Sequence, residues 1–256
     1  MFNGRRMNQE IAALLDLSHE LGREERQLAI LSEGNASARL DGGQFALKAR
    51  GARMASLVES DLTVCRGAPM IELLDRKTLP DATIEKALLD ARVDFAAQMP
   101  GLDSIFHAWL LTLENVRFVG QAHPVAVNQI LASPRARDFA EHRMFPDEIL
   151  FCGAMSVYVP YADPGLPLAW QIRERTRDFI REHGMAPRLI LLQNHGIVAL
   201  GASAPEVLAT VMMANKAALI FSGAAAMGGP TFLLPQHVDR ILARPDEGHR
   251  QRLVDF

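Results

Sequence analysis

Two histidines, His123 and His195, stand directly after stretches of sequence that are typical of β-strands. Gln121 lies two positions before His123, and His195 lies in an Asn-His-Gly turn. Side chains alternate in direction along an extended chain, so Gln121 and His123 can reach one point while His195 approaches it from another strand. Ligands of α/β proteins bind at such strand ends. The spacing predicts a shared metal or substrate site, although it leaves open a purely structural, hydrogen-bonding role for each histidine.

Turn residues and hydrophobic periodicity predict the elements that must position these side chains. Period-two alternation predicts a hairpin of strands 36–40 and 44–48, and further strands are expected at 62–65, 116–121, 189–192 and 197–200. Helices are expected at 7–22, 28–31, 83–98, 104–113, 125–131, 166–183 and 203–226. Strands and helices interleave along the whole chain, which is typical of an α/β domain.

Composition limits the class of protein. The chain has 256 residues, of which 49% are hydrophobic and 22% charged, with a net charge of -3 and 2 cysteines. These values exclude a disordered chain and a disulfide-rich scaffold. We expect one domain over residues 1–256, whose C-terminal tail, from about residue 226 to 256, packs on the body or on a neighbouring subunit.

Several function classes lack support in the sequence. The near-neutral charge without a basic block argues against nucleic-acid binding. No signal peptide or membrane span is expected, because Asn215 and Lys216 interrupt the apolar run at 207–226, which predicts a buried helix instead. Isolated Cys65 and Cys152 are expected to be buried thiols in a reducing cytoplasm. Neither a phosphate-binding Gly-rich loop nor a Gly-x-Ser-x-Gly elbow occurs.

Four short motifs occur in the order and spacing of one known family. They are 34–37 (Gly-Asn-Ala-Ser), 100–103 (Pro-Gly-Leu-Asp) with His107 after it, 121–124 (Gln-Ala-His-Pro) and 194–196 (Asn-His-Gly). On these residues the chain resembles the class II aldolase/adducin family over roughly residues 7–225. The resemblance implies a single-domain class II aldolase-like α/β fold, in which helices flank a central, mainly antiparallel β-sheet.

The resemblance also implies a divalent metal ion, most often zinc, held by three histidines. The matching positions here are Gln121, His123 and His195. A glutamine oxygen is a weaker donor for zinc than an imidazole, so Gln121 either ligates through oxygen or leaves its place to water, with manganese, cobalt or magnesium as alternatives to zinc. The other alternative is a lost metal. We expect a retained site because His123 and His195 are both present.

The acid/base glutamate of the family falls at Asp103. Its carboxylate is one methylene shorter but can still move a proton, and Asp103 can cap the helix that follows it, instead of this role or together with it. His107, one helical turn later, and Asn194, beside His195, are expected to support the site from behind. His107 is also the substitute ligand if Gln121 does not bind metal.

Substrate-binding positions follow from the same resemblance. They are Asn35, Lys48, Arg50, Gly51 and Gly101. Lys48 and Arg50 can hold a phosphate or carboxylate, since guanidinium binds both in a fork, or they can lie on a solvated strand face. A serine pair of the family is replaced by Gly101 and Leu102, which removes two hydroxyls. A carboxylate-bearing or unphosphorylated substrate is therefore an alternative to a sugar phosphate.

The function implied is a metal-dependent lyase of carbohydrate metabolism. It would cleave a carbon-carbon bond of a hydroxy-ketone or sugar-phosphate-like substrate through a metal-stabilised enediolate, with Asp103 moving the proton. The alternatives are decarboxylase, epimerase or dehydratase activity, or a non-catalytic binding or scaffold protein on the same fold. The resemblance further implies a homo-oligomer, usually a tetramer, to whose active sites the tail, with Phe232, His237 and Phe256, could contribute.

Overall fold

The centre of the molecule is a seven-stranded sheet. In the computed structural model, residues 2–244 are described, with side chains from residue 7 onward. The strands are β1 (Asn35–Arg39), β2 (Gln44–Lys48), β3 (Leu62–Arg66), β4 (Phe118–Ala122), β5 (Val157–Val159), β6 (Leu189–Leu192) and β7 (Gly196–Gly201). They lie in the order β3-β2-β1-β4-β7-β6-β5, and every neighbouring pair is antiparallel except β5 and β6. The predicted mainly antiparallel α/β fold is therefore confirmed.

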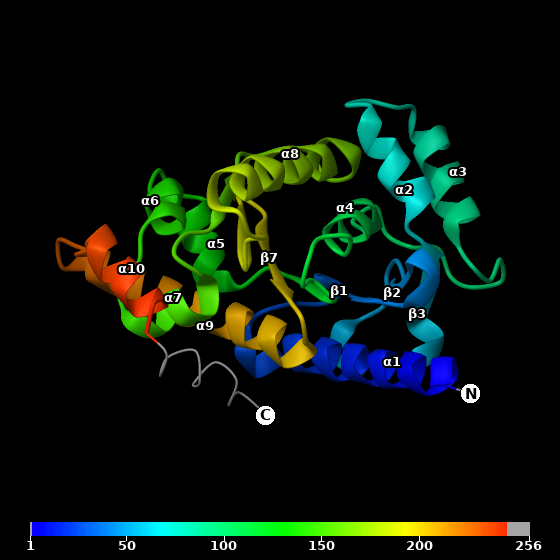
Figure 1. Cartoon of the computed structure of the whole chain (residues 1–256), viewed down its shortest axis with the longest axis horizontal. Helices are drawn as coiled ribbons and strands as arrows, with labels where there is room; N and C mark the ends of the chain where they lie inside the picture. Colours follow the sequence, from blue (N-terminus) through cyan, green and yellow to red (C-terminus); the bar gives the residue numbers. More distant parts are fainter. Residues whose placement is uncertain (1, 245–256) are drawn as a thin grey trace.

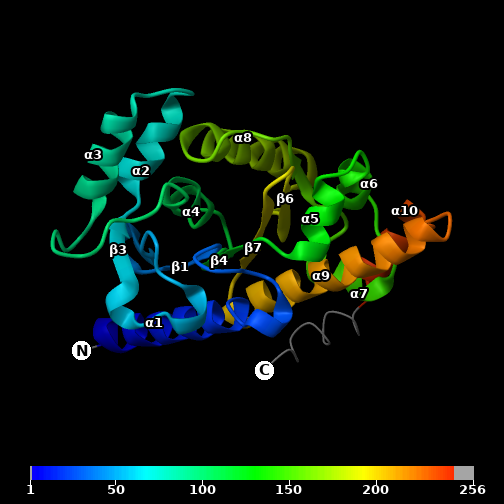
Figure 2. The same cartoon turned by 180° about the vertical axis from the view of Figure 1, so that it is seen from behind.

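Helices cover both faces of the sheet (Figures 1 and 2). One face carries α1 (Phe2–Leu21), α5 (Val125–Leu131), α6 (Ala136–Glu141), α7 (Pro146–Cys152) and α9 (Ala204–Ala226). The other carries α2 (Ala68–Glu72), α3 (Asp81–Ala91), α4 (Ser104–Leu110) and α8 (Leu166–His183). Alternate residues of one strand enter opposite cores: Leu191 of β6 belongs to the core on the α1 and α9 side, and Ile190 belongs to the core on the α4 and α8 side. Burial on both faces explains the uninterrupted apolar sequence of β6.

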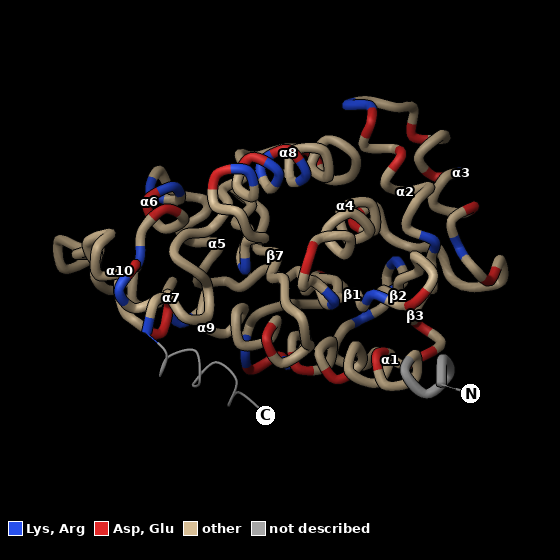
Figure 3. Tube along the Cα trace, in the orientation of Figure 1, with Lys and Arg blue, Asp and Glu red and all other residues tan. Residues whose placement is uncertain are grey.

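The two longest C-terminal helices differ in their surroundings. Figure 3 shows charges of both signs along α8, whereas α9 contains only Glu206 and Lys216 as charged residues. Length and composition alone would let α9 cross a membrane, but half of its most apolar stretch is buried inside the molecule. It packs against α1, α5, α7 and the central strands, as predicted for a buried helix.

Most of the predicted elements are present, with corrections at their ends. The helix predicted at 83–98 ends at Ala91, because Arg92 is extended and forms a bridge with Cys65 of β3. The helical piece predicted at 28–31 is wrong: this segment is irregular, and Leu31 has a positive φ of 59°. The short α2, α6, α7 and β5 were not predicted, since each has too few residues for a clear period.

The first part of the C-terminal tail packs on the body. Its helix α10 (Pro235–Leu242) buries Val238 and Ile241 against Ile149 and Leu150 of the α7 region. Residues 245–256, which include Pro245 and Phe256, lie outside the described residues. The two cysteines, both predicted to be buried, are free buried thiols, and burial raises the pKa of each to about 12.

Gly120 of β4 sets how closely the helices approach the sheet. A Cβ atom at this position would lie 2.6 Å from Val207 Cγ1 of α9 and 3.3 Å from Leu21 Cδ1 of α1. Val207 and Leu21 are both fully buried, so neither side chain has room to move aside. The absence of a side chain at Gly120 therefore lets α1 and α9 pack directly beneath the strand that carries Gln121.

We predict that Gly120→Ala destabilises the protein by about 1–3 kcal/mol through overpacking. Gly223→Ala is the matched control, because the same methyl group would meet nothing within 4 Å on α9. In a helix this change should stabilise by up to about 1 kcal/mol. Urea unfolding of both variants measures the difference, and a stabilising Gly120→Ala would refute the close-packing argument.

Candidate active site

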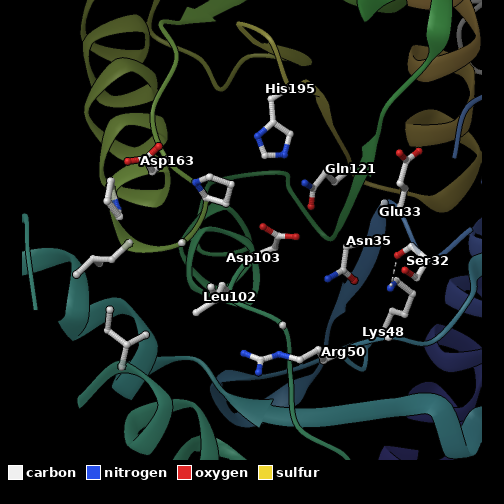
Figure 4. Close-up of a pocket in the computed structure, with 18 of the residues that line it drawn as sticks. Ser32, Glu33, Asn35, Lys48, Arg50, Leu102, Asp103, Gln121, Asp163 and His195 are labelled. Carbon is white, nitrogen blue, oxygen red and sulfur yellow. Dashed lines mark hydrogen bonds between the residues drawn. The ribbon is translucent and has the colours of Figure 1, made fainter. Parts of the chain in front are cut away.

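A cavity of about 870 Å³ opens at the strand ends. It is lined by all nine residues that were expected to contact a metal or substrate, namely Asn35, Lys48, Arg50, Gly51, Gly101, Asp103, Gln121, His123 and His195. His107 and Asn194, which were expected to support the site, do not line it. The four sequence motifs thus meet at one place, as Figure 4 shows for the residues it labels.

Strand pairing explains why distant motifs meet. β4 lies between β1 and β7, and its Gln121 is paired in register with Asn35 on one side and Val198 on the other. The β6–β7 turn then carries His195 back to the same end of the sheet, since Leu192 pairs with Gly196. Backbone pairing alone therefore brings three of the four motifs together.

Three side chains converge at the polar end of the cavity. Figure 4 shows His195, Gln121 and Asp103 pointing toward one another from the β6–β7 turn, β4 and the start of α4. Burial raises the pKa of Asp103, while His195, Lys48 and Gln121 act in the opposite direction. The carboxylate therefore holds its proton more readily than an exposed aspartate does.

The two histidines of the site face each other. Their rings are stacked, with centroids 5.2 Å apart and an interplanar angle of 21°. Burial lowers the pKa of His123 to about 4 and also lowers that of His195, which the Asp103 carboxylate counteracts. Both imidazoles are thus neutral near pH 7, the form that offers a nitrogen lone pair. Gly196 makes room for this arrangement, because a Cβ there would lie 2.7 Å from His123 Cδ2.

Gln121 is buried; its side-chain amide interacts with both Asp103 and His107, and its Oε1 forms no hydrogen bond of normal geometry among the described residues. An unpaired buried carbonyl is costly, so a site normally provides a donor or a cation for it. Within the described part of the chain, no three His, Cys, Asp or Glu side chains form a metal-binding cluster. Two neutral imidazoles and this amide oxygen nevertheless fit a divalent cation as a donor set.

The helix-capping alternative for Asp103 is wrong. Asp103 occupies the N-cap position of α4, but its side chain makes no capping hydrogen bond. Its backbone is already helical, with φ −62° and ψ −22°, whereas a capping residue is extended. The carboxylate is instead available to the cavity, where it lies beside His195 and Gln121.

His107 lies behind the cavity and is fully buried. Its Nδ1 is 2.7 Å from the Ser37 hydroxyl oxygen. Burial lowers its pKa to about 3, an effect that the neighbouring Gln121 amide opposes. His107 is therefore a neutral residue packed against Gln121. Asn194 is exposed and adopts a positive φ of 54°, so it contributes the shape of the turn before His195.

The two basic residues of the cavity differ in their environment. Lys48 is 4% exposed, and its Nζ donates hydrogen bonds to the carbonyl oxygens of Ser32 (3.2 Å) and Ala52 (2.9 Å). The solvated-face alternative is therefore wrong for Lys48, whose pKa burial lowers. Arg50 is exposed and has Nη1 3.8 Å from the Glu85 carboxylate.

Sequence reasoning missed the far wall of the cavity. This wall is built by the start of α3 and by the loop before α8, including Leu79, Ile84, Asp163, Gly165 and Leu166. Neither segment carries a chemical motif. The Pro-containing stretch at 159–165 precedes the helix predicted at 166–183, but nothing in it indicated which cavity it would line.

Comparison with solved structures gives the same fold at low sequence identity. The Class II Aldolase domain of a protein from Thermoplasma acidophilum has a TM-score of 0.66 at 18% identity, covering 83% of this chain and 93% of that one. An L-fuculose 1-phosphate aldolase has a TM-score of 0.67 at 17% identity, with 91% and 94% covered. A sugar-phosphate aldolase from Thermotoga maritima has a TM-score of 0.66 at 16% identity, with 88% and 99% covered.

A match to a family model adds evidence from the sequence itself to these similarities in fold. No curated protein sequence matches the chain. The Class II Aldolase and Adducin N-terminal domain, however, matches residues 12–221, a span that includes all four motifs and every cavity residue named above. The chain belongs to the class II aldolase and adducin family.

Proposed function

We propose that this chain is a metal-dependent lyase of the aldolase type, which cleaves a carbon-carbon bond in a hydroxy-ketone or sugar-phosphate-like substrate. One observation carries the proposal: two stacked, neutral imidazoles, the Gln121 amide and the Asp103 carboxylate line the same cavity. A non-catalytic scaffold would have no need to bury four such groups around an open space.

The residues that would hold the metal are His123, His195 and Gln121. When bound, a divalent ion, zinc foremost, would polarise the substrate carbonyl and stabilise negative charge on its oxygen. Gln121 would contribute a neutral oxygen, a donor that also suits manganese, cobalt or magnesium. The neutrality of His123 and His195 means that no proton has to leave before they donate their lone pairs.

Asp103 is the proton carrier in this proposal. Its raised pKa moves the carboxyl toward neutral pH, where it can accept a proton from carbon or oxygen and return it later in the cycle. His195 and Gln121 border it and orient it toward the same end of the cavity. Asn35, which is paired with Gln121 across the sheet, offers its side-chain amide to substrate oxygens beside them.

Similar folds carry related reactions. Solved neighbours include an L-fuculose 1-phosphate aldolase and a protein from Escherichia coli, YgbL, described as a candidate aldolase, epimerase or decarboxylase. All three reactions begin by stabilising negative charge next to a carbonyl, so the same residues serve each of them. A panel of short hydroxy-aldehydes and ketone donors, phosphorylated and unphosphorylated, distinguishes cleavage from epimerisation and decarboxylation by the products formed.

We predict near-stoichiometric divalent metal in protein purified without added metal or chelator, measured by mass spectrometry of the elements. His123→Ala and His195→Ala should each lose most of it, because either change removes one of two imidazole donors. His183→Ala, at the C-terminal end of α8 and outside the cavity lining, is the control and should retain the metal. Protein that stays metal-free even after soaking in a divalent metal salt would refute the proposal.

Gln121→His should tighten zinc binding if Gln121 occupies a ligand position, because imidazole is the stronger donor for zinc. Competition with a fluorescent zinc chelator measures the dissociation constant. Gln193→His, in the same β6–β7 region but outside the cavity lining, is the control. Equal zinc affinities for the wild type and Gln121→His would show that Gln121 stands outside the ligand set.

Asp103→Asn should reduce turnover by roughly 10²–10⁴-fold, because the amide preserves the shape of the carboxylate but cannot carry the proton. Metal content should change little, since two histidines remain. Asp178→Asn on the exposed side of α8 is the control. Wild-type turnover in Asp103→Asn would assign proton transfer to another group.

A further inference from the structure

One part of the cavity wall carries apolar side chains, which alternate along the chain with the carboxylates of Asp81, Glu85 and Asp163. The apolar side chains are four aliphatic ones and two prolines, namely Leu79, Ile84, Leu102, Leu166, Pro164 and Pro167. We call these six residues the apolar wall. They come from three separate parts of the chain: the segment leading into α3 with α3 itself, the residue before Asp103, and the loop that begins α8. Such a wall forms only in the folded protein.

The apolar wall is a packed surface. Ile84 is 6% exposed and Leu166 is 2% exposed, and both belong to the hydrophobic core on this face of the sheet. Leu79 and Leu102 pack against the same core. Leu102 is also close to the α8 loop, because a Cβ on Gly165 would lie 3.3 Å from its Cδ1. Packing of this kind holds the wall in place before any ligand arrives.

The wall and the buried lysine lie on opposite sides of the cavity. In Figure 4, Leu102 lies on the side away from Lys48, with Asp103 between them. Leu102 directly precedes Asp103 in the chain. From the Asp103, Gln121 and His195 end, the direction that leads away from Lys48 begins at Leu102.

Charge along the cavity disfavours an anion in that direction. Among the described residues that line it, Lys48 and Arg50 are the only Lys or Arg side chains. Lys48 already donates to two backbone carbonyls, and Arg50 faces Glu85. The carboxylates of Asp81, Glu85 and Asp163 line the same cavity. A phosphate there would meet carboxylates and few free donors.

From this wall and this charge distribution we infer that the substrate carries an apolar substituent, aliphatic or aromatic, on its hydroxy-carbonyl head, in place of a phosphate. The inference rests on the proposed function only for the identity of the head, because the apolar wall is a feature of the cavity itself. Contact with Leu102, Leu79 and Ile84 would remove the substituent from water and so favour its binding.

Three probes that share one head test this inference. They are hydroxyacetone, dihydroxyacetone phosphate and 1-hydroxy-3-phenylpropan-2-one, which differ only in the group on the third carbon. Isothermal titration calorimetry measures their dissociation constants, with the protein both metal-free and loaded with zinc. The phenyl probe should bind at least about tenfold more tightly than hydroxyacetone, and the phosphate probe should gain no such advantage.

Leu102→Ser should weaken the phenyl probe roughly tenfold and leave hydroxyacetone unchanged, since only the apolar contact is removed. Leu89→Ser is the matched control, because Leu89 lies on α3 but outside the cavity lining. Thermal unfolding verifies that each variant is folded. Leu79→Ser, at a half-buried position of the same wall, replaces Leu102→Ser if that variant unfolds.

The outcomes separate the two proposals. Tighter binding of the phosphate probe than of the phenyl probe overturns the inference, as does a phenyl probe that shows no measurable binding at millimolar concentration. A phenyl advantage that both Leu102→Ser and Leu89→Ser leave intact also overturns it. A metal-free, inactive protein that still prefers the phenyl probe through Leu102 would refute the lyase proposal while supporting the inference.

Discussion

The pairing of β4 with both of its neighbours is the constraint on which the site depends. Gln121 is in register with Asn35 of β1 and Val198 of β7, so the residues just beyond these strands must meet at one edge. A register slip of one residue would turn Gln121 to the other face of the sheet. Gly120 supports this strand from below, because it lets α1 and α9 approach without a side chain between them. The chemistry of the cavity thus begins with backbone hydrogen bonds and close packing.

Desolvation acts in the same sense on four titratable groups at the polar end. It lowers the pKa values of His123, His195 and Lys48 and raises that of Asp103, so each charged form is disfavoured. The mutual effects of Asp103, His195 and Lys48 oppose this only in part. The result is a polar region in which neutral donors and acceptors dominate, and in which electrostatic interactions with a ligand are stronger than in water.

The sequence predicted well those elements whose ends are set by their own residues. The helices at 125–131 and 166–183 have clear boundaries because Pro124 begins one and Gly184 ends the other, and the motif residues line one cavity as expected. The burial of Lys48 and the uncapped state of Asp103 depend on tertiary packing, which no short pattern encodes. The far wall also depends on tertiary packing: Ile84 and Leu166 line one cavity because α3 and α8 cover the same face of the sheet.

The charged residues that line the cavity affect binding at both of its ends. Besides Asp103, four carboxylates, those of Glu33, Asp81, Glu85 and Asp163, line it against Lys48 and Arg50. Such an excess of negative charge favours a bound cation and opposes a second anion unless that cation offsets it. The amide oxygen of Gln121 can bind such a cation. The apolar side chain of Leu102 offers no charge to a second anion. A neutral substrate with an apolar substituent satisfies both, because its carbonyl needs the cation and its tail needs no counter-charge.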